Sequence, residues 1–267
     1  MKKIFIFLIS ITYLIISCSE PNIAPDLNEN FVKKYPAELN NEWEYSVNIH
    51  IELYDSSGNI DTSFFQTSPN ILTKVERYDS VRNSTVFMSK GLDSNYFKMN
   101  IWFQNTNSGL SALYYSIAFE SIFPKQSDVR NFDLLQNQNR LPVFPCELTQ
   151  NSLRPMPSPW PFEPPRQVIR YPLSVGMNWI EEVEPDYSVR KVISLENVLV
   201  AGKNYMCYKL ESKKDSLKIL TYDHINFDVG LVKRVVIKDS LIYGNLQTQW
   251  RYAKVTTSSN LIRHSIN

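Results

Sequence analysis

Alternating apolar and polar residues are the strongest signal in the chain. From Trp43 to Leu53, six apolar residues occupy every second position, and polar residues fill the positions between them. Because successive side chains of a strand point to opposite faces, this spacing predicts a long strand with one buried face. The turn-forming run Asp55 to Asn59 follows it. Shorter alternating segments predict further strands at 96–103, 113–119, 206–211 and 246–252.

Helical periodicity is scarce by comparison. Residues 126–139 suit one short helix, and residues 109–123 fit either a strand or a helix. One-sided alternation is typical of antiparallel sheets that have one solvated face. The pattern therefore predicts a mainly β protein of antiparallel sheets in two related halves. We expect a curved sheet or half-barrel with at most one or two short helices.

A repeated segment supports the two halves. Residues 35–43 and 171–179 both begin with Tyr-Pro, end with Trp and precede a strand-like run. Proline favours an extended approach to a strand, and the tryptophan then supplies a large core anchor. We predict an N-terminal β-rich half at 34–150, a C-terminal β-rich half at 169–260, and a tail at 261–267.

Prolines are concentrated between the two halves. Six of them lie within residues 153–165. Such a run favours polyproline II structure and excludes a helix or a central strand. We predict a stiff Pro-rich linker at 151–168. The alternative is a loop that contacts a ligand or partner through Trp160 and Phe162.

The N-terminus has the features of an export signal. Lys2 and Lys3 precede an apolar stretch at 4–16, which is too short to span a membrane comfortably and suits a signal peptide. Ile15-Ile16-Ser17-Cys18 resembles the bacterial lipobox, in which a peptidase cuts before a lipid-modified cysteine. The resemblance implies a lipoprotein signal peptide at 1–17 and acylation, such as palmitate, on Cys18.

The segment that follows predicts a tether. Residues 18–33 contain Pro21, Pro25 and several polar residues without periodicity, which is typical of a flexible tether. Several acyl chains anchor a protein stably, whereas one chain is marginal. We therefore expect a protein held in the bacterial cell envelope by its lipid, at the outer membrane, on the periplasmic face or the cell surface.

Charge and composition exclude some classes of protein. The 267 residues carry 28 Lys+Arg and 27 Asp+Glu, so the formal net charge is +1. Nucleic-acid binding requires clustered basic residues, and none are evident. Only 7 glycines are present, which disfavours a glycine-rich phosphate loop.

Candidate chemistry is sparse. The three histidines, His50, His224 and His264, have no second ligand at metal-binding spacing. No serine-nucleophile motif occurs. We predict no catalytic residue, no metal site and no cofactor.

Two groups of residues leave alternatives open. Glu181, Glu182 and Glu184 could form a glycosidase pair, but neighbouring acidic residues usually form a solvated surface, and we expect that here. Cys146 and Cys207 are either two buried free thiols or a disulfide, which an oxidising envelope permits.

The second half resembles uncharacterised lipoproteins of Bacteroidota and related bacteria. The resemblance rests on Tyr-Pro-Leu-Ser-Val-Gly-Met-Asn-Trp at 171–179, on 198–208, and on the Gly-Leu-Val-Lys segment at 230–233. In the first half Asn40-Asn41 replaces the Val-Gly pair. The resemblance implies a β-rich envelope lipoprotein and no catalysis. A remoter likeness to lipoprotein-carrier sheets rests on fold analogy.

Together these features predict a lipid-anchored, non-enzymatic protein with a binding or structural role. Its partner would be a protein, a glycan or an apolar ligand, and not nucleic acid. One alternative is a hydrolase acting on envelope polymers. Another is an accessory subunit of an outer-membrane assembly, with the proline-rich loop as its contact.

Overall fold

The structure is a computed structural model that describes residues 32–91, 98–118, 159–183, 187–245 and 248–267. All of these except Val32 belong to one compact unit, Lys33–Asn267. The expected signal peptide, most of the tether and the possible helix at 126–139 lie outside the described residues.

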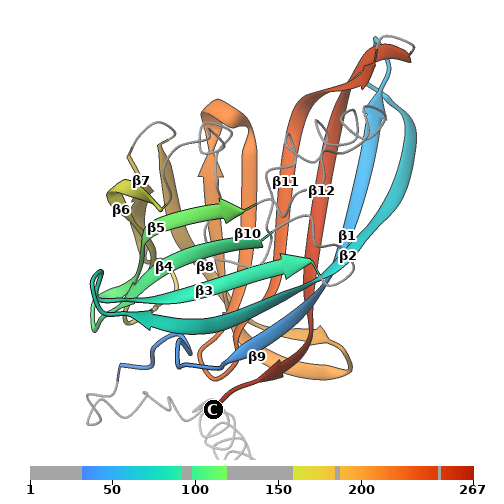
Figure 1. The fold of residues 1–267 in the computed structure, drawn as a ribbon. Coiled ribbons are helices and arrows are strands. Elements are labelled where there is room, and N and C mark those ends of the chain that lie inside the picture. The colour runs from blue at the N-terminus through green and yellow to red at the C-terminus, as the bar shows by residue number, and fades with distance from the viewer. Residues whose placement is uncertain (1–31, 92–97, 119–158, 184–186, 246–247) are drawn as a thin grey trace, which may run out of the picture. The chain divides into compact units, whose positions relative to one another are not determined.

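The described residues form one antiparallel sheet of twelve strands (Figure 1). The first six are β1 Glu42–Tyr54, β2 Ile60–Asp79, β3 Ser84–Gly91, β4 Lys98–Asn105, β5 Gly109–Ala118 and β6 Trp160–Arg170. The second six are β7 Asn178–Glu182, β8 Ser188–Val200, β9 Lys203–Lys214, β10 Ile219–Asn226, β11 Gly230–Asn245 and β12 Thr248–Ser265. Among the described residues, helical structure is limited to a 3-10 turn at Asp215–Leu217.

The strand order shows two meanders placed back to back. It runs β6-β5-β4-β3-β2-β1-β12-β11-β10-β9-β8-β7, so β1 and β12 join two runs of six strands. The predicted mainly β, antiparallel fold in two halves is therefore confirmed. Residues 109–118, which fitted a strand or a helix, form strand β5.

The alternation in β1 positions the core. Its apolar residues Trp43, Tyr45, Val47, Ile49 and Ile51 are all buried, and the polar residues between them are not. We call the concave face of the sheet, to which these five side chains belong, the inner face. A strand with one polar and one apolar face buries the apolar face whenever the sheet curves around it.

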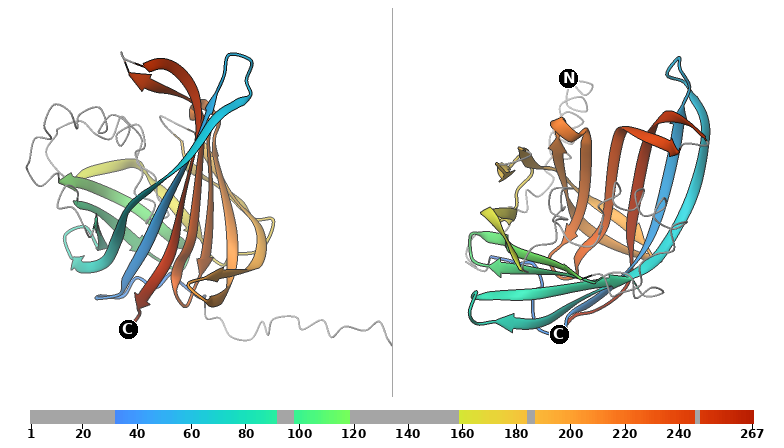
Figure 2. Two further views of the ribbon diagram at one scale, coloured as in Figure 1. Left: turned by 90° about the vertical axis from the view of Figure 1, so that its right-hand side faces the viewer. Right: turned by 45° about the horizontal axis from the view of Figure 1, so that its top comes forward.

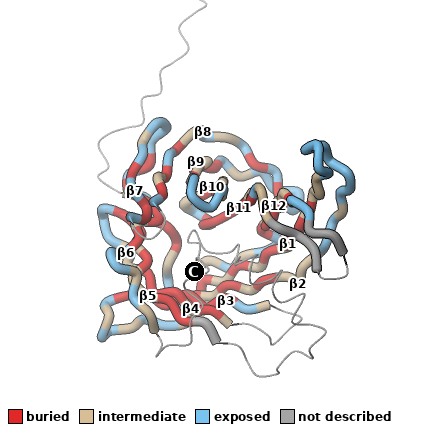
Figure 3. The backbone as a smooth tube through the Cα atoms, turned by 90° about the horizontal axis from the view of Figure 1, so that it is seen from above, coloured by how far each residue is buried: buried red, intermediate tan, exposed pale blue. Residues whose placement is uncertain are grey.

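The sheet curves until its two edge strands meet. Figure 3 shows β6 and β7 next to each other, and Figure 2 shows the same curvature from two other directions. The indole Nε1 of Trp179 on β7 donates to the carbonyl oxygen of Gln167 on β6 at 2.7 Å. No backbone ladder joins β6 and β7 among the described residues. The sheet is thus a half-barrel that nearly closes.

The structure corrects the second part of the expected linker. Residues 160–168 lie in β6, which pairs with β5, whereas 151–158 lie outside the described residues. Pro161, Pro164 and Pro165 exclude a central strand, but an edge strand needs hydrogen bonds on one side only. The register between β6 and β5 also shifts beside Pro164 and Pro165. These two prolines are unpaired with β5, so their lack of an N–H group removes no hydrogen bond from the ladder.

The expected C-terminal tail is wrong as well. Residues 261–265 continue β12, because β1 offers a partner along its whole length. Leu261 is buried opposite Tyr45, and His264 lies opposite Trp43. A buried leucine in a paired strand stabilises this end of the sheet through its apolar contact.

The two Tyr-Pro segments meet in space. The hydroxyl of Tyr171 accepts from the backbone N–H of Tyr35 at 2.8 Å and donates to Oδ1 of Asn105 at 3.0 Å. The side-chain amide of Asn105 donates in turn to the carbonyl oxygen of Tyr35 at 2.9 Å. The segments that open β1 and β7 are therefore tied to each other and to the end of β4.

Gly230 lets the chain pass close to these anchors. Its φ is +97°, and a Cβ built on it would lie 3.1 Å from the Tyr35 hydroxyl and 3.2 Å from Nε1 of Trp43. The hairpin between β8 and β9 contains Gly202, with φ +75° and nothing within 4 Å of an added Cβ. The two glycines share a left-handed backbone but differ in the space around them.

We expect Gly230→Ala to destabilise the fold more than Gly202→Ala. A left-handed alanine costs about 1–2 kcal/mol at either position. At Gly230 the added methyl group also displaces Tyr35 or Trp43. Urea unfolding of both variants measures the difference, and equal losses of unfolding free energy would contradict this account of Gly230.

Candidate functional site

Aromatic side chains fill the inner face of the first meander. The rings of Trp43 and Phe87 stack with centroids 6.0 Å apart, and Phe87 meets Phe103 edge-on at 5.0 Å. Nε1 of Trp43 donates to the carbonyl oxygen of Val229 at 2.5 Å, so the indole also reaches the second meander. This region is a packed core.

The inner face of the second meander is charged instead. Four cationic and three acidic side chains are buried there, six of them from β7 to β11 and one, Arg166, from β6 at the edge of the first meander. We call them the buried ion network: Arg166, Glu181, Glu182, Arg190, Lys214, Asp223 and Arg234. Fully buried charges are rare in proteins unless they are paired.

One end of the buried ion network joins the two edge strands. Arg166 on β6 lies 3.0 Å from Glu182 and 3.6 Å from Glu181, both on β7. Lys214 on β9 reaches across β8 to Glu182, with 2.6 Å between Nζ and Oε2. Ion pairs between side chains therefore hold β6 and β7 together, although no backbone ladder joins these two strands among the described residues.

The other end runs along the second meander. Arg190 on β8 lies 2.8 Å from Glu181 and 2.9 Å from Asp223 on β10. Arg234 on β11 lies 3.2 Å from the other oxygen of Asp223. Each of the three carboxylates thus contacts two cations, which compensates for the loss of its hydration.

Glu181 and Glu182 correct an expectation from the sequence. They do not form a solvated surface, since only 4% and 8% of these residues is exposed. Burial alone would raise the pKa of Glu181, but Arg190 and Arg166 hold it below its usual value. A glycosidase acid requires a raised pKa, so Glu181 is unsuited to that role.

The other members of the buried ion network were not predicted from the sequence, because charged residues were expected to face solvent. Arg190, Asp223 and Arg234 occupy inner-face positions. Asp223 lies directly opposite Arg234 in the ladder of β10 and β11. Opposite charges at directly paired positions could have indicated an ion pair, but these positions can be recognised only when the register of the strands is known.

Trp160 and Phe162 lie in β6 and not in a free loop. Both half-buried rings pack on Tyr115 of β5, with centroids 5.1 and 4.9 Å away. The guanidinium of Arg166 lies 5.3 Å from the centre of the Phe162 ring. Both aromatic residues thus have contacts within the sheet, and their role as a ligand or partner contact stays a prediction.

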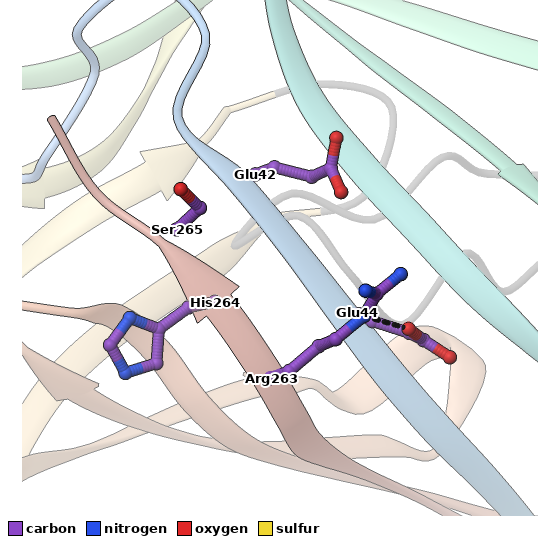
Figure 4. Close-up of a pocket in the computed structure, with 5 residues that line it drawn as sticks. All are labelled: Glu42, Glu44, Arg263, His264 and Ser265. Atoms are coloured by element: carbon purple, nitrogen blue, oxygen red, sulfur yellow. Dashed lines mark hydrogen bonds and ion pairs between the residues drawn. The ribbon is translucent and has the colours of Figure 1, made fainter.

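The three histidines lie apart. His50 stacks on Phe65 at 4.4 Å. His224 Nε2 lies 3.0 Å from Oε1 of Glu196, and burial lowers the pKa of His224. His264 borders a small hollow with Glu42, Glu44, Arg263 and Ser265, about 80 Å³ in volume (Figure 4). Arg263 bonds to Glu44 there.

Cys207 has no disulfide partner among the described residues, and burial raises the pKa of its thiol to about 12. Such a thiol is protonated and unreactive at neutral pH. Cys146 lies outside the described residues, so its pairing with Cys207 stays a prediction.

Within the described ranges, no three His, Cys, Asp or Glu residues are grouped to hold a metal ion. None of the described residues forms a helix long and apolar enough to cross a membrane. A scan of protein-family models and a search of curated proteins found no match to this chain.

We expect Asp223→Asn to destabilise the protein by about 3–5 kcal/mol, because it removes a buried carboxylate that two arginines contact. The matched control is Asp228→Asn. Asp228 pairs with Lys33 at 3.3 Å, but both side chains are exposed. Exposed pairs contribute about 0–1 kcal/mol. Urea unfolding at neutral pH compares the two, and a loss in Asp223→Asn no larger than in the control would show that the buried ion network is dispensable.

The stabilising effect of Glu181 should depend on pH. Because its pKa is lowered in the folded state, its contribution is present above its unfolded pKa of about 4.3 and is lost as the pH falls through the folded value. The stability gap between wild type and Glu181→Gln is therefore largest near neutrality and shrinks in acid. Urea midpoints measured from pH 7 to strong acid test this, and a constant gap would argue against an ionised Glu181.

Proposed function

We propose that this protein is a lipid-anchored protein of the bacterial cell envelope, attached through Cys18, with a non-enzymatic binding or structural role. The observation that carries the proposal is the lipobox-like Ile15-Ile16-Ser17-Cys18 segment directly after a short apolar stretch. Two lysines precede that stretch, as in export signals. The described sheet supplies the body that the lipid would hold at the membrane.

The chemistry of the buried ion network supports a non-enzymatic role. Acid–base catalysis needs titrating groups whose pKa values are pushed apart. Here each carboxylate contacts two cations, and the pKa of Glu181 is lowered. Such compensation favours a fixed charge state, which suits a structural network.

The same network favours a polar partner over an apolar ligand. An acyl chain on the inner face of β7 to β11 would lie against Arg190, Asp223 and Arg234, which gain nothing from hydrocarbon. On the other half, the inner face is filled by stacked rings such as Trp43 and Phe87. A protein or a glycan bound on the outer surface of the sheet is the partner we propose.

Growth of the producing cell with a labelled fatty acid tests the anchor. We expect label on the wild-type protein and none on Cys18→Ala, because the thiol is the acceptor. Cys207→Ala is the matched control, and it should keep the label because its thiol is buried and protonated. Equal labelling of wild type and Cys18→Ala would overturn the proposed function.

A further inference from the structure

The hairpin of β8 and β9 reaches past the neighbouring strand. Ile225 is the last residue of β10 that pairs with β9, and its partner is Tyr208. The hairpin continues beyond Tyr208 to the turn at Ala201 and Gly202, both of which have positive φ. Beyond Tyr208 the ladder with β10 stops, although the side-chain amide of Asn226 still donates to the carbonyl oxygen of Met206 at 3.0 Å.

The two faces of the hairpin differ in burial. Val198, Val200 and Cys207 are buried on one face. On the other face Leu195, Leu199 and Met206 are exposed by 48%, 69% and 50%. Met206 pairs with Asn197, which lies between Leu195 and Leu199 on β8, so the three apolar side chains are neighbours across the ladder. We call Leu195, Leu199 and Met206 the hairpin patch.

The hairpin patch lies at the end of the sheet where the chain enters the compact unit. Lys33, its first residue, pairs with Asp228 at 3.3 Å. The ring of the adjacent Phe227 lies 5.9 Å from that of Tyr208, and Tyr208 pairs with Leu195 of the hairpin patch. Figure 1 shows the start of the described chain and the β8–β9 hairpin at the same end, the bottom of that view.

We propose that the hairpin patch docks into the bilayer that holds the lipid on Cys18, which rests on the proposed function. Residues 18–32 extend at most about 3.6 Å each, or about 50 Å in total. The tether thus holds this end of the sheet near the membrane surface at high effective concentration. Lys203 in the hairpin is exposed and suits contact with anionic headgroups.

A second copy of the chain fits the hairpin patch less well. A stable protein interface buries about 800 Å² on each partner. Three half-exposed side chains on one hairpin supply only part of that area. A bilayer has no such minimum, since insertion of each apolar side chain is favourable by itself.

The test uses full-length acylated protein in vesicles of phosphatidylethanolamine and phosphatidylglycerol with brominated acyl chains. Leu199→Trp places a reporter in the hairpin patch, and Phe65→Trp places one near the opposite end of the sheet, where Phe65 is 78% exposed. The unsubstituted protein corrects for the native tryptophans. We expect Leu199→Trp emission to shift to the blue and to fall at least twofold through bromine quenching. Phe65→Trp should behave as in lipid-free buffer.

A second variant tests whether the side chains of the hairpin patch themselves cause docking. Leu195→Ser with Met206→Ser, added to Leu199→Trp, should reduce the quenching, and an unchanged urea midpoint shows that the sheet is intact. Acylated protein whose Leu199→Trp reporter is quenched no more than Phe65→Trp overturns the docking and leaves the anchor standing. A blue shift without bromine quenching that grows with protein concentration overturns it in favour of a second copy. Failure of Cys18 to acquire label overturns both.

Discussion

The nearly closed sheet depends on charges paired away from water. β6 and β7 meet without a backbone ladder, and Arg166 with Glu181 and Glu182 holds them together. Burying such groups carries a desolvation cost that only complete pairing offsets. The network therefore stabilises the closed arrangement as a unit, and loss of one member leaves its neighbours in a region of low dielectric. Because the charges act together, the network favours this one closed arrangement, and a single substitution within it weakens the whole closure.

The inner face combines two kinds of packing. Stacked rings fill the side built by β1 to β4, and ion pairs fill the side built by β7 to β11. The two meet at β12, which lies between β1 and β11, and there the hydroxyl of Tyr45 donates to the carbonyl oxygen of Leu231 at 2.8 Å. Burial raises the pKa of Tyr45, with Asp223 adding to the effect. Tyr45 is thus apolar in its ring and polar at its tip, which suits a boundary position.

Sequence alone predicted the parts of the fold that follow from one-sided alternation. The strand from Trp43 is an example, because a period-two pattern depends only on local order. The two-half organisation followed instead from the repeated segments at 35–43 and 171–179. The charged half of the core was not predictable in this way. Arg190 and Asp223 meet because β8 and β10 are brought into one register with β9, and pairing across strands is not written in any one segment. Likewise, prolines at 161–165 excluded a central strand but did not separate an edge strand from a linker.

The placement of β6 opposite β7 has a consequence for behaviour at high local concentration. Open sheet edges are templates on which chains polymerise into aggregates. In this sheet one edge carries prolines, the other is only five residues long, and each covers the other. The protection is confined to β6 and β7, because among the described residues 60–70 of β2 pair with β1 alone and leave one side of that ladder open to incoming chains.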